Sequence, residues 1–176
     1  MPEFNPTRDV VVLFKGDSYT VSVSQAMRDG GWLGGQGVQW VDSPTRDEFL
    51  VSYSDGLYGG FLLWGSNESS DQLVSTEEQQ PTYGYATFCA GGWLMQNRAF
   101  ERFTYASRVG PGPLVPITYV VGQRVVFSLR GLYTNEDEWT LSGDPRAPNG
   151  YYIANVVDTP RRFGRGVYYI TLQTSI

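Results

Sequence analysis

The chain has 176 residues, of which 41% are apolar and 15% aromatic, so one domain can bury a core without disulfides or metal. Its net charge of −5 disfavours binding to free DNA or RNA, because that function needs basic residues that neutralise phosphates. With one cysteine and no histidine, the chain lacks the usual zinc ligand sets and the Ser-His-Asp and Cys-His catalytic arrangements. The sequence therefore indicates no cofactor, no metal site and no catalytic residue.

Residues 1–8 are predicted to form an extended arm, because Pro2 and Pro6 restrict the backbone. Phe4 gives this arm one apolar side chain that can dock on a neighbouring molecule or on its own domain. The N-terminal sequence has neither a secretory signal nor a transit-peptide pattern, and no segment has the apolar length needed to cross a bilayer. We therefore expect a protein made in the cytoplasm that has no membrane partner.

The first half of the chain is expected to form short strands at residues 10–14, 19–24, 38–41, 49–53 and 61–64. The glycines between residues 30 and 37 match neither G-x-x-x-x-G-K nor G-x-G-x-x-G, so a phosphate-binding loop is disfavoured. This segment is predicted to be a flexible loop that presents Trp32. An exposed Trp can anchor an interface or stack on a sugar, although packing back onto the core is the commoner outcome for such a side chain.

Residues 65–81 are polar, acidic and free of aromatic side chains, and they are expected to form a long exposed loop within one domain. Cys89 lies in an aromatic run and has no histidine to activate it, so a buried structural thiol is favoured over a nucleophile. Asn135, Glu136, Asp137 and Glu138 gather at one turn. Their spacing does not match an EF-hand loop, which favours a solvated acidic turn over a calcium site.

The second half is expected to form strands at residues 83–89, 102–105, 117–121, 124–129, 151–157 and 167–174. Only residues 92–100 are compatible with a helical turn or two. Gly122 is predicted to adopt the positive φ of a hairpin turn, and the strand after it ends at Gly131. These short strands predict an all-β fold over residues 1–176: a single-domain antiparallel sandwich or barrel, jelly-roll-like, with an extended N-terminal arm and long loops.

The loop predicted at residues 161–166 contains Arg161, Arg162 and Phe163. One basic turn on an acidic protein makes a poor groove for RNA. A solvated hairpin turn and a contact with another protein both remain open for this loop.

The chain from Gly112 to Ile176 contains "GPLVPITYVVGQRVVFSLRGLYTNEDE", "PNGYYIANVVDTP" and "GVYYITLQTSI". This succession resembles the C-terminal part of small virion proteins of tailed bacteriophages, in particular the capsid decoration or cement class. The resemblance implies a β-rich, non-enzymatic protein that forms homo-oligomers, for example trimers, on the capsid exterior and clamps neighbouring capsomers by binding the major capsid protein. The candidate interface residues are Phe4, Trp32, Arg161, Arg162 and Phe163.

Three alternatives remain open at this point. The first is another phage structural part, such as a tail or head-completion protein. The second is a carbohydrate-binding or receptor-binding β-sandwich module, since five Trp and twelve Tyr supply material for sugar-stacking surfaces. The third is a histidine-free hydrolase that uses two carboxylates across a cleft, and eighteen acidic residues provide such pairs by chance.

Overall fold

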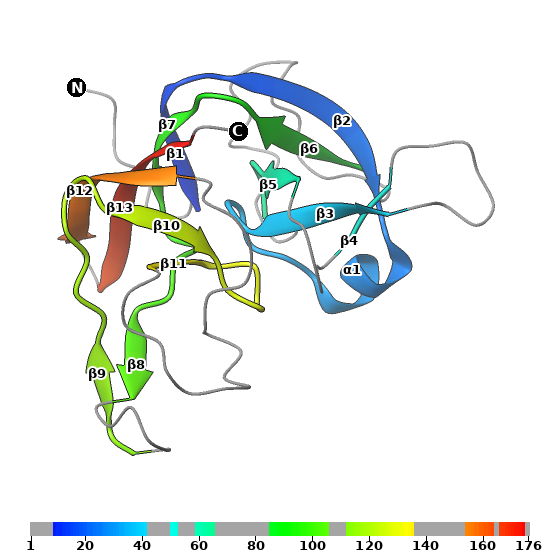
Figure 1. Cartoon of the computed structure of the whole chain (residues 1–176). Helices are drawn as coiled ribbons and strands as arrows, with labels where there is room; N and C mark the ends of the chain where they lie inside the picture. Colours follow the sequence, from blue (N-terminus) through cyan, green and yellow to red (C-terminus); the bar gives the residue numbers. More distant parts are fainter. Residues whose placement is uncertain are drawn as a thin grey trace.

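The computed structural model describes residues 9–41, 50–52, 59–65, 85–105, 112–135, 154–163 and 166–174, and all the structural statements below concern these ranges. They form thirteen strands and one short helix (Figure 1). The bounds are β1 Val10–Phe14, β2 Asp17–Val23, α1 Gln25–Gly30, β3 Gly37–Val41, β4 Leu50–Ser52, β5 Gly60–Leu62, β6 Tyr85–Ala90, β7 Leu94–Asn97, β8 Phe103–Tyr105, β9 Leu114–Pro116, β10 Arg124–Phe127, β11 Tyr133–Asn135, β12 Ala154–Phe163 and β13 Val167–Thr174.

Six strands form an antiparallel sheet in the order β1-β7-β13-β12-β10-β11. The long strands β12 and β13 pair as neighbours along the chain, while β7 lies between β1 and β13. Buried and less buried side chains alternate in β7 and along much of β13, as the period of two of a strand requires. This alternation gives the sheet one face rich in Val, Ile, Leu and Met, which is buried.

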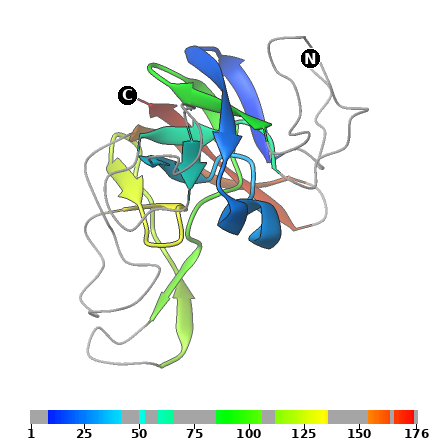
Figure 2. The same ribbon diagram turned by 90° about the vertical axis from the view of Figure 1, so that its right-hand side faces the viewer.

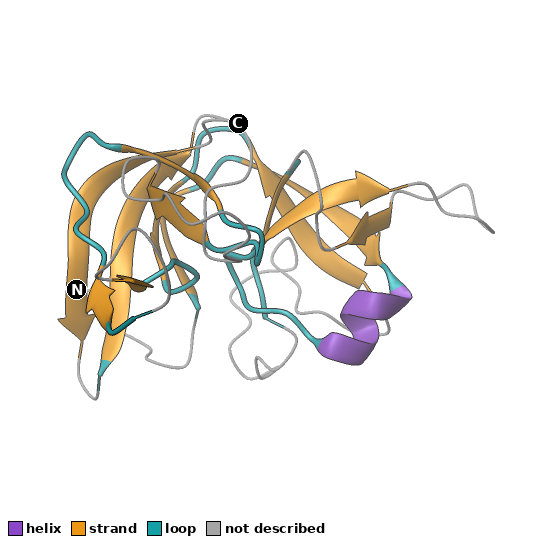
Figure 3. Cartoon of the chain, turned by 60° about the horizontal axis from the view of Figure 1, so that its bottom comes forward, coloured by secondary structure: helices purple, strands orange, loops and turns teal. Residues whose placement is uncertain are grey.

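Five other strands pair in the order β2-β4-β3-β5-β6. The first and last of them, β2 and β6, also pair with each other, which closes the order. Only the β2–β4 pair is parallel. Helix α1 follows β2 directly and begins at Ser24, whose side chain accepts a hydrogen bond from the Met27 backbone N–H. Figure 3 shows α1 at one end of the molecule. This group has its own buried cluster of Val21, Val23, Met27, Trp32, Val38, Leu62, Ala86 and Phe88.

The two groups of strands pack against each other through the larger hydrophobic cluster. Phe61 on β5 and Cys89 on β6 belong to this cluster together with Met95 and Leu172 of the six-stranded sheet. Trp93, between β6 and β7, contacts Phe61 edge-on with ring centroids 5.7 Å apart. The Trp93 indole also donates to the Ala90 carbonyl at 2.9 Å, so its polar atom is satisfied within the core. The all-β fold with antiparallel sheets packed together is confirmed.

One glycine joins the two groups of strands through its backbone. Gly131 lies in the turn between β10 and β11 and has a φ of 76°, which disfavours any residue with a side chain. Its N–H donates to the Ser128 carbonyl at 2.9 Å, and its carbonyl accepts from Gly37 N–H of β3 at 2.8 Å. A Cβ at Gly131 would lie 2.8 Å from the Gly37 carbonyl oxygen, so the close approach itself needs glycine.

Several local predictions are wrong. Residues 25–30 form the helix, whereas the proposed helical turn at 92–100 contains β7, because Met95 and Asn97 point into the core at a strand's spacing. The strand expected at 117–121 lies earlier, at Leu114–Pro116. Gly122 has the predicted positive φ of 84°, but its turn does not make a hairpin, since β10 pairs with β11 and β12. The strand β12 extends to Phe163, so residues 161–163 are not in a loop.

Four predicted features fall wholly or partly outside the described residues. These are the N-terminal arm at 1–8 with Phe4, the acidic loop at 65–81 beyond Gly65, the acidic residues at 136–138, and residues 164 and 165 of the 161–166 segment. The assignment of residues 1–176 to one domain stays a prediction.

We expect Leu172→Ala to lower the free energy of unfolding by about 2 to 5 kcal/mol, because this fully buried side chain lies at the centre of the six-stranded sheet. Leu13→Ala is the matched control, since Leu13 is 49% exposed on the edge strand β1, and we expect it to change stability by less than about 0.5 kcal/mol. Urea unfolding followed by fluorescence measures both. Equal losses in the two variants would contradict the placement of the core.

Candidate functional site

Strands β8 and β9 form a two-stranded hairpin that is separate from the other sheets. Figures 1 and 2 show this β8–β9 hairpin extending away from the rest of the molecule. Thr104 pairs with Val115, and Phe103 pairs with Pro116. Because side chains alternate between faces, Phe103 and Leu114 lie on the same face of the hairpin. Both side chains are exposed, and Leu114 is 52% exposed.

The chain from Arg102 to Asn135, which includes the hairpin, is unusual in both charge and exposed apolar surface. It has four arginines and no aspartate or glutamate. Among the described residues, twelve large hydrophobic side chains are exposed, and six of them lie in this segment: Phe103, Leu114, Val115, Val120, Val121 and Leu129. Of these six, Phe103, Leu114 and Val115 lie on the β8–β9 hairpin, and exposed apolar side chains on one projecting element are typical of a surface that contacts another molecule.

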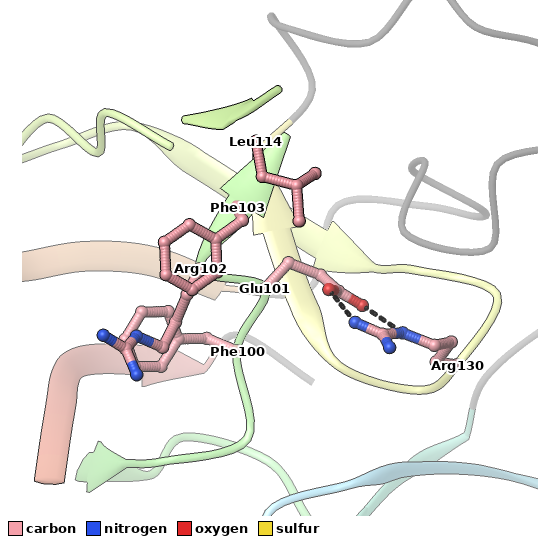
Figure 4. A pocket seen from close by; sticks show the side chains of 6 residues that line it. All are labelled: Phe100, Glu101, Arg102, Phe103, Leu114 and Arg130. Atoms are coloured by element: carbon pink, nitrogen blue, oxygen red, sulfur yellow. Dashed lines mark hydrogen bonds and ion pairs between the residues drawn. The ribbon is translucent and has the colours of Figure 1, made fainter. Parts of the chain in front are cut away.

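A pocket of about 340 Å³ lies at the base of the hairpin (Figure 4). Its apolar lining comes from the aromatic rings of Phe100 and Phe103 and from Leu114. Its charged lining comes from Glu101, Arg102 and Arg130. Figure 4 shows Arg130 turned toward Glu101, while the Arg102 side chain extends away from this pair. The pocket therefore combines an apolar wall with charged groups of both signs.

Glu101 carries the charge that lies deepest in this region, with a side chain only 1% exposed. Arg130 donates to both carboxylate oxygens, through Nε to Oε1 at 3.0 Å and through Nη2 to Oε2. The Ser128 hydroxyl donates to Oε1 at 2.9 Å. A fork of two parallel bonds from arginine is the strongest geometry available to a carboxylate. The Arg130 side chain itself remains 50% exposed, so it presents donors to the pocket mouth.

The backbone of Glu101 is held as tightly as its side chain. Its N–H donates to the Tyr133 carbonyl of β11 at 2.7 Å, and its carbonyl accepts from the Tyr119 hydroxyl at 2.6 Å. Just beyond, Ile117 N–H donates to the Arg102 carbonyl at 2.8 Å. These bonds join the start of β8 to the end of β9 and to β11, so the hairpin leaves the body from a fixed base.

Arg102 stacks on two aromatic rings at the other side of this base. Its guanidinium carbon lies 3.9 Å from the ring centroid of Tyr168 on β13 and 5.1 Å from that of Phe103. These are favourable distances for a cation–π contact. The contact ties the first residue before β8 to the central strand of the six-stranded sheet.

The residues proposed from the sequence as interface candidates do not form this site. Trp32 is 9% exposed and its indole N–H donates to the Trp64 carbonyl at 2.8 Å, so its use as an exposed interface anchor is wrong and its packing onto the core is confirmed. Arg161 is exposed and pairs with Asp158 at 2.7 Å. Phe163 is half-buried against Tyr169, with ring centroids 5.7 Å apart. Arg162 is exposed on β12, and Phe4 lies outside the described residues.

The structure also tests the predictions made for Cys89 and for the acidic turn that begins at Asn135. Cys89 is fully buried in the larger cluster, as expected of a structural thiol. Tyr133 lies in the same cluster, and its burial, with a smaller contribution from Cys89, raises the pKa of the phenol. Asn135 is buried rather than solvated and donates to the Thr118 carbonyl at 3.1 Å. In the ranges that the structure describes, no group of three or more His, Cys, Asp or Glu could hold a metal ion.

The sequence reasoning missed the pocket because its residues come from three separate places in the chain. The signal that could have found the region is the run of 34 residues from Arg102 to Asn135 without an acidic residue, in a chain of net charge −5. Such charge asymmetry is readable before any fold is known.

No protein-family model matches this sequence, and no curated protein matches it either. Within the described part of the chain, none of the helical structure is long and apolar enough to span a membrane.

We expect Arg130→Met to lower the free energy of unfolding by about 1 to 3 kcal/mol, because it leaves the buried Glu101 carboxylate without its main partner. The double variant Glu101→Gln with Arg130→Met should recover part of this loss, since the unpaired charge is removed. Urea unfolding of the wild type, both single variants and the double variant gives the coupling energy. Additive losses would contradict the proposed dependence of Glu101 on Arg130.

Proposed function

We propose that this protein is a structural virion protein that binds the assembled capsid surface and cements neighbouring capsomers. The observation that carries the proposal is the β8–β9 hairpin, which projects from the body and exposes Phe103, Leu114 and Val115. A projecting, apolar element of this kind supplies contact area to a neighbour. The resemblance of residues 112–176 to capsid decoration proteins of tailed phages supports the choice of a capsid, with the major capsid protein as partner and the capsid exterior as location.

The energetics of the hairpin suit this role. Burying one exposed Leu or Phe side chain contributes about 1.5 to 3 kcal/mol, so Phe103 and Leu114, which share one face of the hairpin, offer a few kcal/mol per contact before the costs of association. A protein that binds only the assembled shell stabilises that shell by mass action. Because a shell repeats the same site many times, a modest gain at each site is sufficient. The role needs contact surface and no reacting group.

The pocket lining contains one carboxylate, Glu101, which is already bonded to Arg130 and Ser128. A glycosidase of the ordinary type needs two carboxylates across a cleft. The pocket therefore supports a contact site better than hydrolysis.

A carbohydrate-binding module is the second candidate, and Trp40 on β3 is the observation that favours it. This side chain is 43% exposed and its ring leans on Phe88, with centroids 4.6 Å apart. A partly exposed indole held by a buried ring can stack on a sugar.

A tail or head-completion protein would use the same contact surface as a capsid protein, so the location in the particle decides between them.

Counting copies in purified particles tests the proposed function. We expect a copy number comparable to the number of capsomers, and saturable binding of added purified protein to particles that lack it. Quantitative mass spectrometry and electron microscopy of the particles measure both. A handful of copies per particle would move the protein to the tail, and specific retention on a glycan array without capsid binding would favour the carbohydrate module.

A further inference from the structure

The pocket at the base of the hairpin contains hydrogen-bond donors that its own salt bridge does not use. Arg130 binds the Glu101 carboxylate through Nε and Nη2. The outer edge of its guanidinium, formed by Nη1 and Nη2, has no acceptor among the described residues, and the side chain is 50% exposed. Because the buried carboxylate already fixes the guanidinium plane, this outer edge is a preorganised fork for a second carboxylate.

Apolar side chains line the same pocket. Phe100, Phe103 and Leu114 lie around it together with the charged pair (Figure 4). The pocket volume of about 340 Å³ is close to the lower end of ligand pockets, about 300 Å³, so it has room for one small group. A ligand that satisfies both kinds of lining must therefore carry its carboxylate directly beside a compact apolar group.

The hairpin next to the pocket favours a polypeptide as the source of this carboxylate. Strand β9 contributes Leu114 to the pocket, and neither β8 nor β9 pairs with a third strand of the described chain. The unpaired edge of a strand can form backbone hydrogen bonds with an extended segment of another chain. A C-terminal apolar residue carries the side chain and the carboxylate on one Cα, and the residues before it can follow this edge.

We propose that this pocket binds the C-terminal residue of a partner polypeptide when that residue is apolar. Arg130 receives the terminal carboxylate, while Phe103 and Leu114 receive the side chain. Glu101 is a positioning residue, because it is buried and holds Arg130 in place. The inference goes beyond the proposed function: it names a ligand chemistry that is tested on the purified protein, whatever the copy number in particles.

The need for a carboxylate is tested on the wild-type protein with acetyl-Gly-Ser-Leu, as the free acid and as the C-terminal amide. We expect isothermal titration calorimetry to give a Kd below about 1 mM for the acid and binding at least about tenfold weaker for the amide. Acetyl-Gly-Ser-Ser as the free acid lacks the apolar side chain and should also bind about tenfold more weakly or worse. Equal binding of the acid and the amide would overturn the proposal, and so would an acid that does not bind at all.

The apolar lining is tested with Leu114→Asp and its matched control Leu33→Asp. Leu114 and Leu33 are 52% and 50% exposed, and only Leu114 lines the pocket. We expect Leu114→Asp to raise the Kd of the acid peptide at least about tenfold, because it removes apolar surface and adds a like charge beside the terminal carboxylate. Leu33→Asp should leave the Kd within about twofold of the wild type. The same Kd in both variants would place the peptide elsewhere on the molecule.

The role of Arg130 is tested with Arg130→Lys, which keeps a positive charge near Glu101 but has no second fork. We expect this variant to prefer the acid over the amide by less than about threefold. The control Arg162→Lys changes an exposed arginine of β12 that does not line the pocket, and it should keep the wild-type preference. Circular dichroism and the urea midpoint establish that each variant is folded. An unchanged preference in a folded Arg130→Lys protein would contradict the assignment of the carboxylate to this side chain.

Other ligands of the pocket give different results. Acetyl-leucine that binds as tightly as the tripeptide would reject a polypeptide source, because the strand edge would then contribute nothing. Single-stranded RNA that binds only when Leu114 is present, without binding of the acid peptide, would reject the carboxylate ligand. A protein that binds the acid peptide but occurs in a handful of copies per particle would keep this site and lose only the proposed capsid role.

Discussion

The position of the β8–β9 hairpin depends on one buried carboxylate. Glu101 lies two residues before β8, and each of its polar groups is bound to a different part of the body: the β11 backbone, Tyr119, Ser128 and Arg130. Burying a charge is costly unless hydrogen bonds and a counter-charge replace water, and all of these are present. The bonds therefore fix where the hairpin leaves the body. The apolar side chains of the hairpin, Phe103, Leu114 and Val115, are exposed beyond this fixed base.

Most strand positions could be predicted from the sequence, because short runs of apolar, β-branched and aromatic residues are local patterns. Val10–Phe14, residues 124–127 and Val167–Thr174 are such runs and are found where the pattern places them. Residues 117–121 show the same alternation but form no strand, since Ile117 and Tyr119 are buried while their backbone finds no parallel or antiparallel neighbour among the described strands. Leu114–Pro116 was missed because proline argues against a strand, although an isolated hairpin tolerates it. The six-residue helix at 25–30 depends on a Ser24 cap and one buried side chain, Met27. This pattern is too short to predict a helix from the sequence.

The candidate site was harder to predict because it depends on contacts between distant residues. Glu101 and Arg130 are separated by 29 positions, and no spacing rule relates them. Trp32 illustrates the opposite error: glycines on both sides suggested a flexible loop, whereas a hydrogen bond to the Trp64 carbonyl places the indole in the core. Composition over a long window was more informative than any single aromatic residue, since the stretch from 102 to 135 without acidic residues contains the hairpin and four of the residues that line the pocket.

The order of strands has a consequence for how the nascent chain folds. The strands β2 to β6 all lie within residues 17–90, so they can pair early in synthesis. The six-stranded sheet cannot, because β13 sits between β7 and β12 and is made last. Until Thr174 has left the ribosome, the apolar side chains of Phe61 and Cys89 lack the sheet that covers them. Such late, long-range pairing slows folding and leaves apolar surface open to aggregation while the sheet is incomplete.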